Sequence, residues 1–313
     1  MLSLPLRTPG ISLIAFYLMG SRATKAGKAR KATLEDGHDT AGAGYRTAAQ
    51  VFSNSASALV ATLLWGALHA PGFPGARRAS LVLEVQGTPY AQDEWCPLDP
   101  AVSNGWSRAL LLVVLGHFAC CLGDTLASEL DILSETPPIL LTTLKTVPPG
   151  TNGGLSLVGT AASVGGGMAM GWVMWATLSV ENAVCRDMTG EILLQMLALG
   201  ALAGGAGSLS FVTVLSGLSA SYVFKGHPFW DVQLLCVQYR MLDSLLGATL
   251  QRTQYSETRK LILIDTAAPP EATEEIKIVS GIDVFTNNQA SLFDGVVNLI
   301  ASTATALALA YFF

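Results

Sequence analysis

The sequence predicts an all-α fold, a polytopic membrane helix bundle of about six or seven transmembrane helices. Composition is the main reason: of 313 residues, 50% are hydrophobic and 13% are charged, and the mean hydropathy is +0.45. Soluble domains carry about 25% charged residues, so this chain lacks the charge that a water-exposed surface requires. Its 31 glycines are typical of membrane helices, because small residues let helix backbones approach closely.

Apolar stretches of the length that a bilayer core requires, about 20 residues, recur along the chain. They are residues 51–70, 106–122, 153–180, 192–224, 232–250 and 292–313. The stretch 192–224 is too long for one untilted helix, which leaves the number of crossings open. Residues 2–20 form a weaker candidate, because Pro5, Arg7 and Pro9 interrupt them. They could also be a secretory signal peptide, although the basic cluster that follows favours a membrane anchor.

Positive charge orients the predicted spans, because basic loops stay on the cytoplasmic side. Loop 21–50 carries Arg22, Lys25, Lys28, Arg30, Lys31 and Arg46. In loop 71–105 two arginines are offset by four acidic residues. Loop 21–50 is therefore predicted to face the cytoplasm, stroma or matrix, and loop 123–152 the same side, two crossings later. Topology alone explains the basic loop, and a binding role for Lys25 is an added hypothesis.

Net charge and cysteine content exclude two classes of protein. A net charge of −5 and a pI near 5.4 offer no attraction to nucleic-acid phosphates. Five cysteines, with Cys120 and Cys121 adjacent in an apolar run, are too sparse for an extracellular disulfide scaffold. The partner that the composition predicts is the lipid bilayer, and the oligomeric state stays open.

A polar cluster, GDTLASE (123–129), ends the predicted span 106–122. Carboxylates at the end of a membrane helix are costly unless they meet water, a metal or a cation. On a helix Asp124 and Ser128 share a face, and Glu129 lies about 140° round from Asp124. Carboxylates beside a hydroxyl suit Mg²⁺. Two interpretations remain equally open: a magnesium site at Asp124 and Glu129, or a solvated interfacial cap.

A second cluster, KTVPPGTNGG (145–154), leads directly into the predicted span 153–180. A glycine-rich loop that enters a helix exposes backbone N–H groups and the positive end of the helix dipole to an anion. The candidate phosphate-binding residues are Lys145, Gly150, Thr151, Asn152, Gly153 and Gly154. The alternative is an ordinary Pro-Gly turn before a helix.

Two later features add polar groups near predicted spans. Asp243 lies within the apolar stretch 232–250, and Asn287 and Asn288 precede the last span. Tandem asparagines can also be a simple helix cap. The four histidines show no metal-ligand spacing. Taken together, the clusters indicate phosphate and Mg²⁺ chemistry at a membrane interface.

The ordered motifs GDTLASE (123–129), KTVPPGTNGG (145–154), DSLLGATLQ (243–251) and GIDVFTNN (281–288), with the basic loop around Lys25, resemble the transmembrane protein 19 family. The resemblance covers most of residues 16–313. That family looks related to plant phytyl-phosphate kinase, which makes phytyl diphosphate from phytyl phosphate. The resemblance therefore implies a kinase that converts an isoprenoid (phytyl or prenyl) monophosphate to the diphosphate with Mg²⁺ and a nucleoside triphosphate, either CTP or ATP.

The resemblance also implies roles for the candidate residues. Asp124, Glu129 and Asp243 become metal ligands and catalytic residues. Lys25 joins the nucleotide- and phosphate-binding set of Lys145 and residues 150–154. Asn287 and Asn288, together with Asp243, position the acceptor phosphate or a second metal. The alternatives are a transporter or channel, or a member without catalytic activity. An endomembrane and the plastid envelope both remain possible locations.

The chain departs from the family pattern in two places. Family members usually have further apolar segments upstream of the position where this chain begins. Residues near 211–240 form an insert that the family lacks, within an otherwise single integral-membrane domain, 1–313. A shared site for loops 21–50, 123–152 and 251–290 requires an even number of crossings between them, so the insert is predicted to add none or two.

Overall fold

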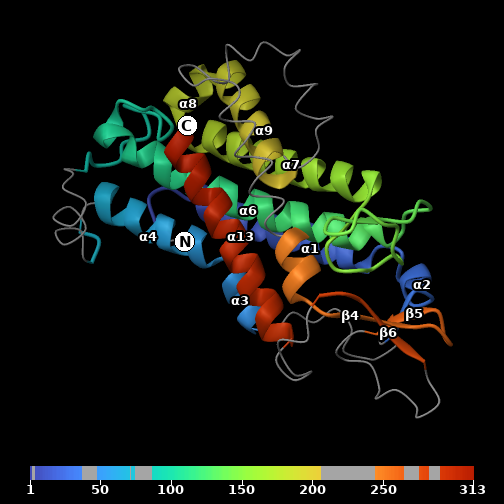
Figure 1. Ribbon diagram of the computed structural model, residues 1–313. Helices are drawn as coiled ribbons and strands as arrows, with labels where there is room; N and C mark the ends of the chain where they lie inside the picture. Colours follow the sequence, from blue (N-terminus) through green and yellow to red (C-terminus); the bar gives the residue numbers. More distant parts are fainter. Residues whose placement is uncertain are drawn as a thin grey trace.

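The computed structural model describes residues 1, 4–36, 48–70, 72–74, 87–205, 244–263, 275–281 and 290–313. These residues form a bundle of helices with a small sheet at one end (Figure 1). The helices are α1 (Thr8–Lys25), α2 (Lys28–Lys31), α3 (Ala48–Ser53), α4 (Ala56–His69), the 3-10 helix η1 (Val102–Gly105), α6 (Trp106–Asp131), α7 (Leu157–Glu181), α8 (Ala183–Asp187), α9 (Thr189–Gly205) and α13 (Ala290–Phe312). Residues 244–250 are also helical.

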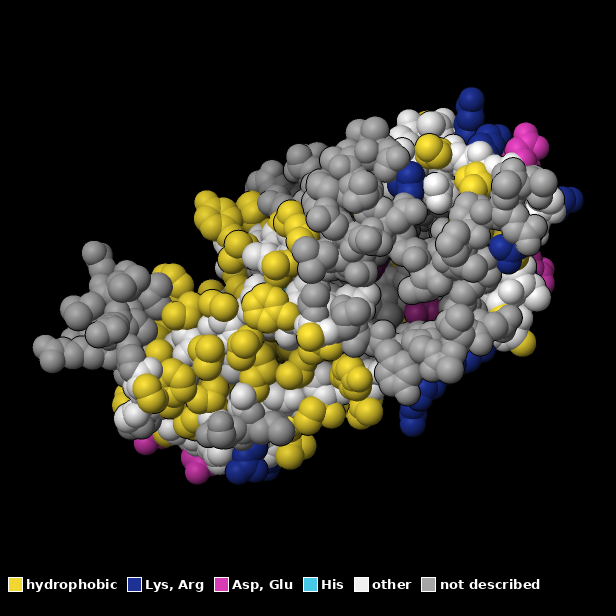
Figure 2. All heavy atoms as spheres, turned by 90° about the horizontal axis from the view of Figure 1, so that it is seen from below, with side chains coloured by type: hydrophobic (Ala, Val, Ile, Leu, Met, Phe, Trp, Pro, Cys, Tyr) yellow, Lys and Arg dark blue, Asp and Glu magenta, His cyan; other side chains and the backbone are white. Residues whose placement is uncertain are grey.

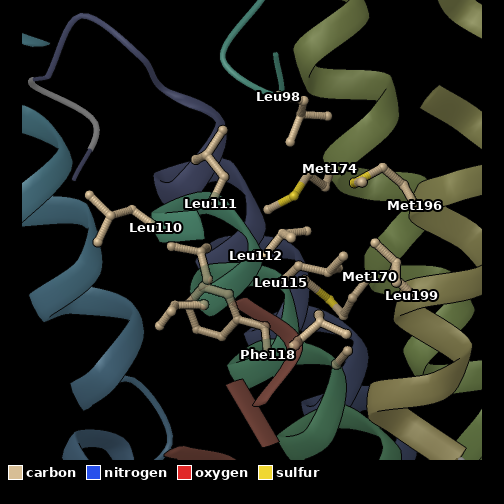
Figure 3. Packing of buried hydrophobic residues seen from close by; sticks show 14 of the residues in the cluster. Leu98, Leu110, Leu111, Leu112, Leu115, Phe118, Met170, Met174, Met196 and Leu199 are labelled. Atoms are coloured by element: carbon tan, nitrogen blue, oxygen red, sulfur yellow. The ribbon is translucent and has the colours of Figure 1, made fainter. Parts of the chain in front are cut away.

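Helix α6 lies at the centre of the bundle and packs against α1, α4, α7, α9 and α13. Its 26 residues are apolar over most of their length, as expected of a helix that is covered on all sides. Figure 3 shows Leu112 and Leu115 of α6 pointing towards Met170 of α7 and Leu199 of α9. This core fixes the positions of both ends of α6.

Small residues form the contact between α6, α7 and α9. A Cβ at Gly167 of α7 would overlap the carbonyl oxygen of Gly200 in α9, and a Cβ at Gly204 would lie 2.6 Å from the Cα of Gly167. The Ser163 hydroxyl donates a hydrogen bond across the same contact to the Gly204 carbonyl. The predicted role of glycine in close helix packing is therefore realised at named positions.

Three helical segments are long and apolar enough to cross a bilayer among the described residues: 102–131, 157–181 and 295–312. Helix α4 and residues 190–205 are shorter apolar helices. Each of these segments overlaps a predicted span, and the predicted span 51–70 is divided by a break at Asn54 and Ser55 between α3 and α4. Figure 2 shows apolar side chains spread over one part of the surface and charged side chains gathered mainly at the sheet end.

The prediction of an all-α fold missed a small four-stranded sheet, with strand order β1-β5-β4-β6. Its strands are β1 (Glu35–Asp36), β4 (Thr253–Ser256), β5 (Leu261–Leu263) and β6 (Ile276–Ser280). β1 pairs with β5 in parallel, and β4 pairs antiparallel with β5 and β6. A second pair, β2 (Ile139–Leu140) and β3 (Gly154–Leu155), is antiparallel. The strands have at most five residues, too few for a clear alternating pattern.

A disulfide bond between Cys96 and Cys185 lies at the other end of the bundle. It joins the loop before η1 to α8, and Asn182 supports it by accepting a hydrogen bond from the Cys185 N–H (2.8 Å) and donating one to the Trp95 carbonyl (2.9 Å). The sequence excluded a disulfide scaffold but gave no sign of this single bond, because its cysteines are 89 residues apart. We call the two ends of the bundle the disulfide end and the sheet end.

Candidate functional site

The sheet end brings together three loops that are distant in sequence. β1 of loop 21–50 pairs with β5, so that Glu35 lies opposite Ile262. The Asn152 N–H donates a hydrogen bond of 3.1 Å to the Thr253 hydroxyl at the start of β4. The described parts of loops 21–50, 123–152 and 251–290 therefore meet in one place, as a shared site requires.

An ion pair fixes the basic loop to the end of α6. Lys31 is 1% exposed and its ammonium group pairs with the Glu129 carboxylate, which is 21% exposed. The same ammonium group lies 3.4 Å from the Ala23 carbonyl. Gly27, with a φ of 64°, packs its backbone against Leu133 just beyond α6. The partner of Glu129 is thus a buried lysine of the basic loop, whose positive charge had indicated only the membrane topology.

Asp124 lies on a different face of α6 from Glu129. It follows Gly123, whose backbone packs against Gly204 and Ser163, and its side chain is partly buried. Asp131 lies seven residues further along α6, and hence on nearly the same helix face as Asp124. It was not among the site residues predicted from the sequence. The two carboxylates are about 10 Å apart along the axis, at 1.5 Å per residue.

Asp131 connects α6 to the N-terminus of α7. Its carboxylate accepts a hydrogen bond from the Ser156 side chain, and the Ser156 hydroxyl in turn accepts one from the Gly159 N–H (3.0 Å). The other carboxylate oxygen, Oδ1, is buried and has no hydrogen-bond partner in the described part of the chain. Gly159 makes room for this carboxylate, since a Cβ there would lie 3.3 Å from Oδ1.

Hydrogen bonds between residues of loop 145–154 occupy some of the groups that a phosphate-binding loop would offer to its ligand. The buried Thr151 hydroxyl donates to the Pro148 carbonyl (2.7 Å), and the Gly154 N–H donates to the Thr151 carbonyl (3.0 Å). Gly150 and Gly153 have positive φ values, 88° and 76°. Thr151 and the Asn152 N–H therefore stabilise the loop, while the side chains of Asn152 and Lys145 are exposed.

The described parts of three sequence motifs touch one another through their backbones. Gly153 packs so closely on the helical turn 244–250 that a Cβ would lie 2.6 Å from the Ser244 carbonyl oxygen. Gly281, with a φ of 76°, packs against the Gln251 carbonyl and donates its N–H to Ala248 (2.9 Å). The Ser280 hydroxyl donates to Thr253 (2.9 Å) and lies 3.3 Å from the Asn152 carbonyl.

Several predicted residues are not brought into this contact. Asp243, Asn287 and Asn288, like the predicted insert 211–240, lie outside the described residues. Lys25 is exposed at the C-terminus of α1. Among the residues that the structure describes, no three His, Cys, Asp or Glu side chains form a ready-made metal cluster.

The chain matches one family model and is similar to two further proteins. The sequence model of the family described as Integral membrane protein DUF92 matches residues 1–211 and 196–306. Protein PGR of Arabidopsis thaliana is 28% identical over 304 residues, which cover 97% of this chain and 82% of that protein. Uncharacterized membrane protein MJ0933 of Methanocaldococcus jannaschii is 39% identical over 61 residues, 20% of this chain and 26% of that protein.

No solved structure matches the chain. The long family match and the apolar helices together establish an integral, multi-pass membrane protein. They also confirm the resemblance that the motifs indicated, to the relatives of transmembrane protein 19. The chain belongs to the integral membrane protein family DUF92.

Proposed function

We propose that the protein is an integral-membrane kinase that converts an isoprenoid monophosphate to the diphosphate, with a nucleoside triphosphate as donor. The observation that carries this proposal is the contact between motifs at the sheet end, where Gly153, Ala248 and Gly281 pack together. Backbones that pack this closely hold their loops in a fixed relation, and phosphoryl transfer depends mainly on such positioning.

The charge distribution at this end suits two phosphate-bearing substrates. Lys25, Lys28 and Lys145 are exposed, and each supplies a mobile positive charge for a phosphate group. The exposed Asn152 side chain adds hydrogen-bond donors. In the reaction, an oxygen of the lipid monophosphate attacks the γ-phosphorus of the triphosphate. The bond from that phosphorus to the β–γ bridging oxygen breaks, and the nucleoside diphosphate leaves.

The oxygen donors on one edge of α6 fit Mg²⁺ as a partly hydrated ion, and since Asp124 and Asp131 are about 10 Å apart along the axis, each ion would meet only one of the two carboxylates. Asp124, Ser128 and Asp131 offer only oxygen donors, the ligands that Mg²⁺ prefers, and Mg²⁺ commonly binds one or two protein carboxylates together with phosphate oxygens and water. The buried, unpaired Oδ1 of Asp131 is consistent with a cation nearby. Glu129 forms an ion pair with Lys31, so its role is to position the basic loop against α6. Asp124 remains the metal ligand. Bound Mg²⁺ would neutralise phosphate charge.

An amphiphilic substrate also needs an apolar surface next to the polar loops. Leu144 and Leu157 are 77% and 83% exposed on either side of loop 145–154. Leu157 begins α7, one of the apolar helices that can cross a bilayer. An isoprenoid chain in the membrane could therefore lie along this side of α7 while its phosphate meets the loop.

A direct test incubates the purified protein in lipid nanodiscs with phytyl or farnesyl monophosphate, Mg²⁺ and either CTP or ATP. The expected product is the corresponding diphosphate, detected by mass spectrometry, and its formation should stop when EDTA removes Mg²⁺. Asp93→Asn, an exposed carboxylate at the disulfide end, serves as the control for Asp124→Asn. Isoprenoid phosphate entering sealed liposomes without any diphosphate product would refute the kinase and favour a transporter.

A further inference from the structure

A cleft of about 960 Å³ lies at the disulfide end, between the start of α6 and the end of α13. Trp106 and Arg108 line it from α6, and Leu307, Tyr311 and Phe312 line it from α13. Arg108 and Asp124 are separated by 16 positions of one helix, which is about 24 Å at 1.5 Å per residue. The cleft is thus distinct from the candidate site at the sheet end.

Arg108 is the cationic side chain of this cleft and is partly buried. It makes no hydrogen bond and no ion pair with any residue in the described parts of the chain. Asp99 is the acidic group whose charge acts on it, but Asp99 accepts a hydrogen bond from the Ala101 N–H (2.9 Å) and lies beyond ion-pair distance. A guanidinium carries five N–H donors, and desolvating them without an anion is unfavourable.

The remaining lining suits the chain of a lipid. It consists mainly of aromatic and small apolar side chains, including Ala304 and Ala308, which leave space between the two helices. Tyr311 is 82% exposed, and Trp106 and Tyr311 are the residue types that gather where a membrane meets water. The start of α6 also turns the positive end of its helix dipole towards this interface.

We propose that this cleft binds an anionic membrane lipid from the leaflet at the disulfide end. The lipid phosphate pairs with the guanidinium of Arg108, which matches a phosphate with two parallel N–H···O bonds. One acyl chain lies in the groove beside Ala304, Ala308 and Leu307. This site is independent of the proposed kinase activity, since none of its residues belongs to the sheet end.

The test measures quenching of Trp106 fluorescence in nanodiscs that contain a minor fraction of brominated phosphatidylglycerol or brominated phosphatidylcholine. The chain has six tryptophans, so the Trp106 signal is the difference between wild type and Trp106→Phe. We expect the affinity for phosphatidylglycerol to be about tenfold higher than that for phosphatidylcholine, which corresponds to about 1.4 kcal/mol of binding free energy. Arg108→Gln should abolish the preference and Arg108→Lys should keep part of it. Arg7→Gln, an exposed arginine at the same end, should leave it unchanged.

Three outcomes would overturn the proposal. Equal quenching by both lipids in the wild type would mean that the head group is not recognised. A preference that survives Arg108→Gln would remove the guanidinium from recognition. Competition by inorganic phosphate as effective as that of the lipid would make a free anion the ligand. If Arg108→Gln does not fold, Ala308→Phe fills the groove instead and should also abolish the preference.

Discussion

Asp124 and Glu129 are five residues apart on α6 and have different surroundings. Glu129 pairs with the buried Lys31, whereas Asp124 follows the glycine contact with α7 and α9. Helical geometry alone separates the two side chains by about 140°, so this division could be predicted from the sequence. The identity of the partner could not, because Lys31 is 98 residues away and looks like any other lysine of a basic loop.

At the residue scale, Asp124→Asn should abolish diphosphate formation and leave membrane insertion intact. Changes to residues that merely support a metal ligand cost up to about 100-fold in activity, so loss of the ligand itself should cost more. The change removes one charge from a partly buried position and should not lower the melting temperature. Steady-state kinetics and thermal melting in detergent check this prediction, and near-normal turnover in the folded variant would remove metal binding from the account.

Glu129→Gln should act mainly on stability. It leaves the buried Lys31 ammonium without its counter-charge, and breaking a buried pair costs about 3–5 kcal/mol; the lower figure is expected because Glu129 is 21% exposed. Glu135→Gln, an exposed carboxylate outside the ion pair, is the control. Thermal melting separates this role from metal binding. An unchanged melting temperature together with weaker Mg²⁺ binding would restore Glu129 as a ligand.

Lys145 provides the corresponding test on the phosphate side. Because it is exposed, Lys145→Ala should raise the KM for the nucleotide several-fold without changing stability. Lys145→Arg should rescue the KM only in part, since a planar guanidinium and a compact ammonium bind phosphate differently. The same KM in all three proteins would make Lys145 an ordinary surface lysine.

At the scale of elements, the helices could be predicted but the sheet could not. Apolar stretches of the right length predicted the positions of α4, α6, α7, α9 and α13. The strands of the sheet are at most five residues long and pair segments as distant as Glu35 and Ile262. Short strands are stabilised by pairing and packing rather than by local sequence, which is why the prediction of an all-α fold omitted them.

The glycine contact between α7 and α9 gives a prediction with a control on the same helix. Gly167→Ala should destabilise the protein by about 1–3 kcal/mol, the usual cost of overpacking, because its Cβ would overlap the Gly200 carbonyl oxygen. Gly165→Ala should be neutral or slightly stabilising, since nothing lies within 4 Å of its Cβ and alanine favours helix. Equal melting temperatures for the two variants would show that the helices do not pack this closely.

At the scale of the whole molecule, the two ends of α6 differ in chemistry. The described parts of the basic loop and of the later motifs meet at the sheet end, and the other end carries the disulfide between Cys96 and Cys185. Disulfides persist in oxidising compartments and are rare in the cytosol, so we expect the disulfide end to face the side of the membrane opposite the basic loop. The basic loop predicted the same orientation, although the bond itself could not be predicted from two distant cysteines.

Accessibility labelling of single cysteines tests whether the motif-bearing loops share one membrane face. The substitutions Lys28→Cys, Glu135→Cys and Glu257→Cys report on the three loops, and Glu94→Cys reports on the disulfide end. All four side chains are exposed. The background lacks Cys120, Cys121 and Cys236 but keeps the disulfide, because oxidised cysteines do not react with maleimide.

The experiment applies a membrane-impermeant maleimide to sealed vesicles of known orientation, before and after permeabilisation. The account predicts that positions 28, 135 and 257 react from the same side and that position 94 reacts only from the other. Reaction of position 257 from the side of position 94 would separate the motifs across the bilayer and contradict a shared site.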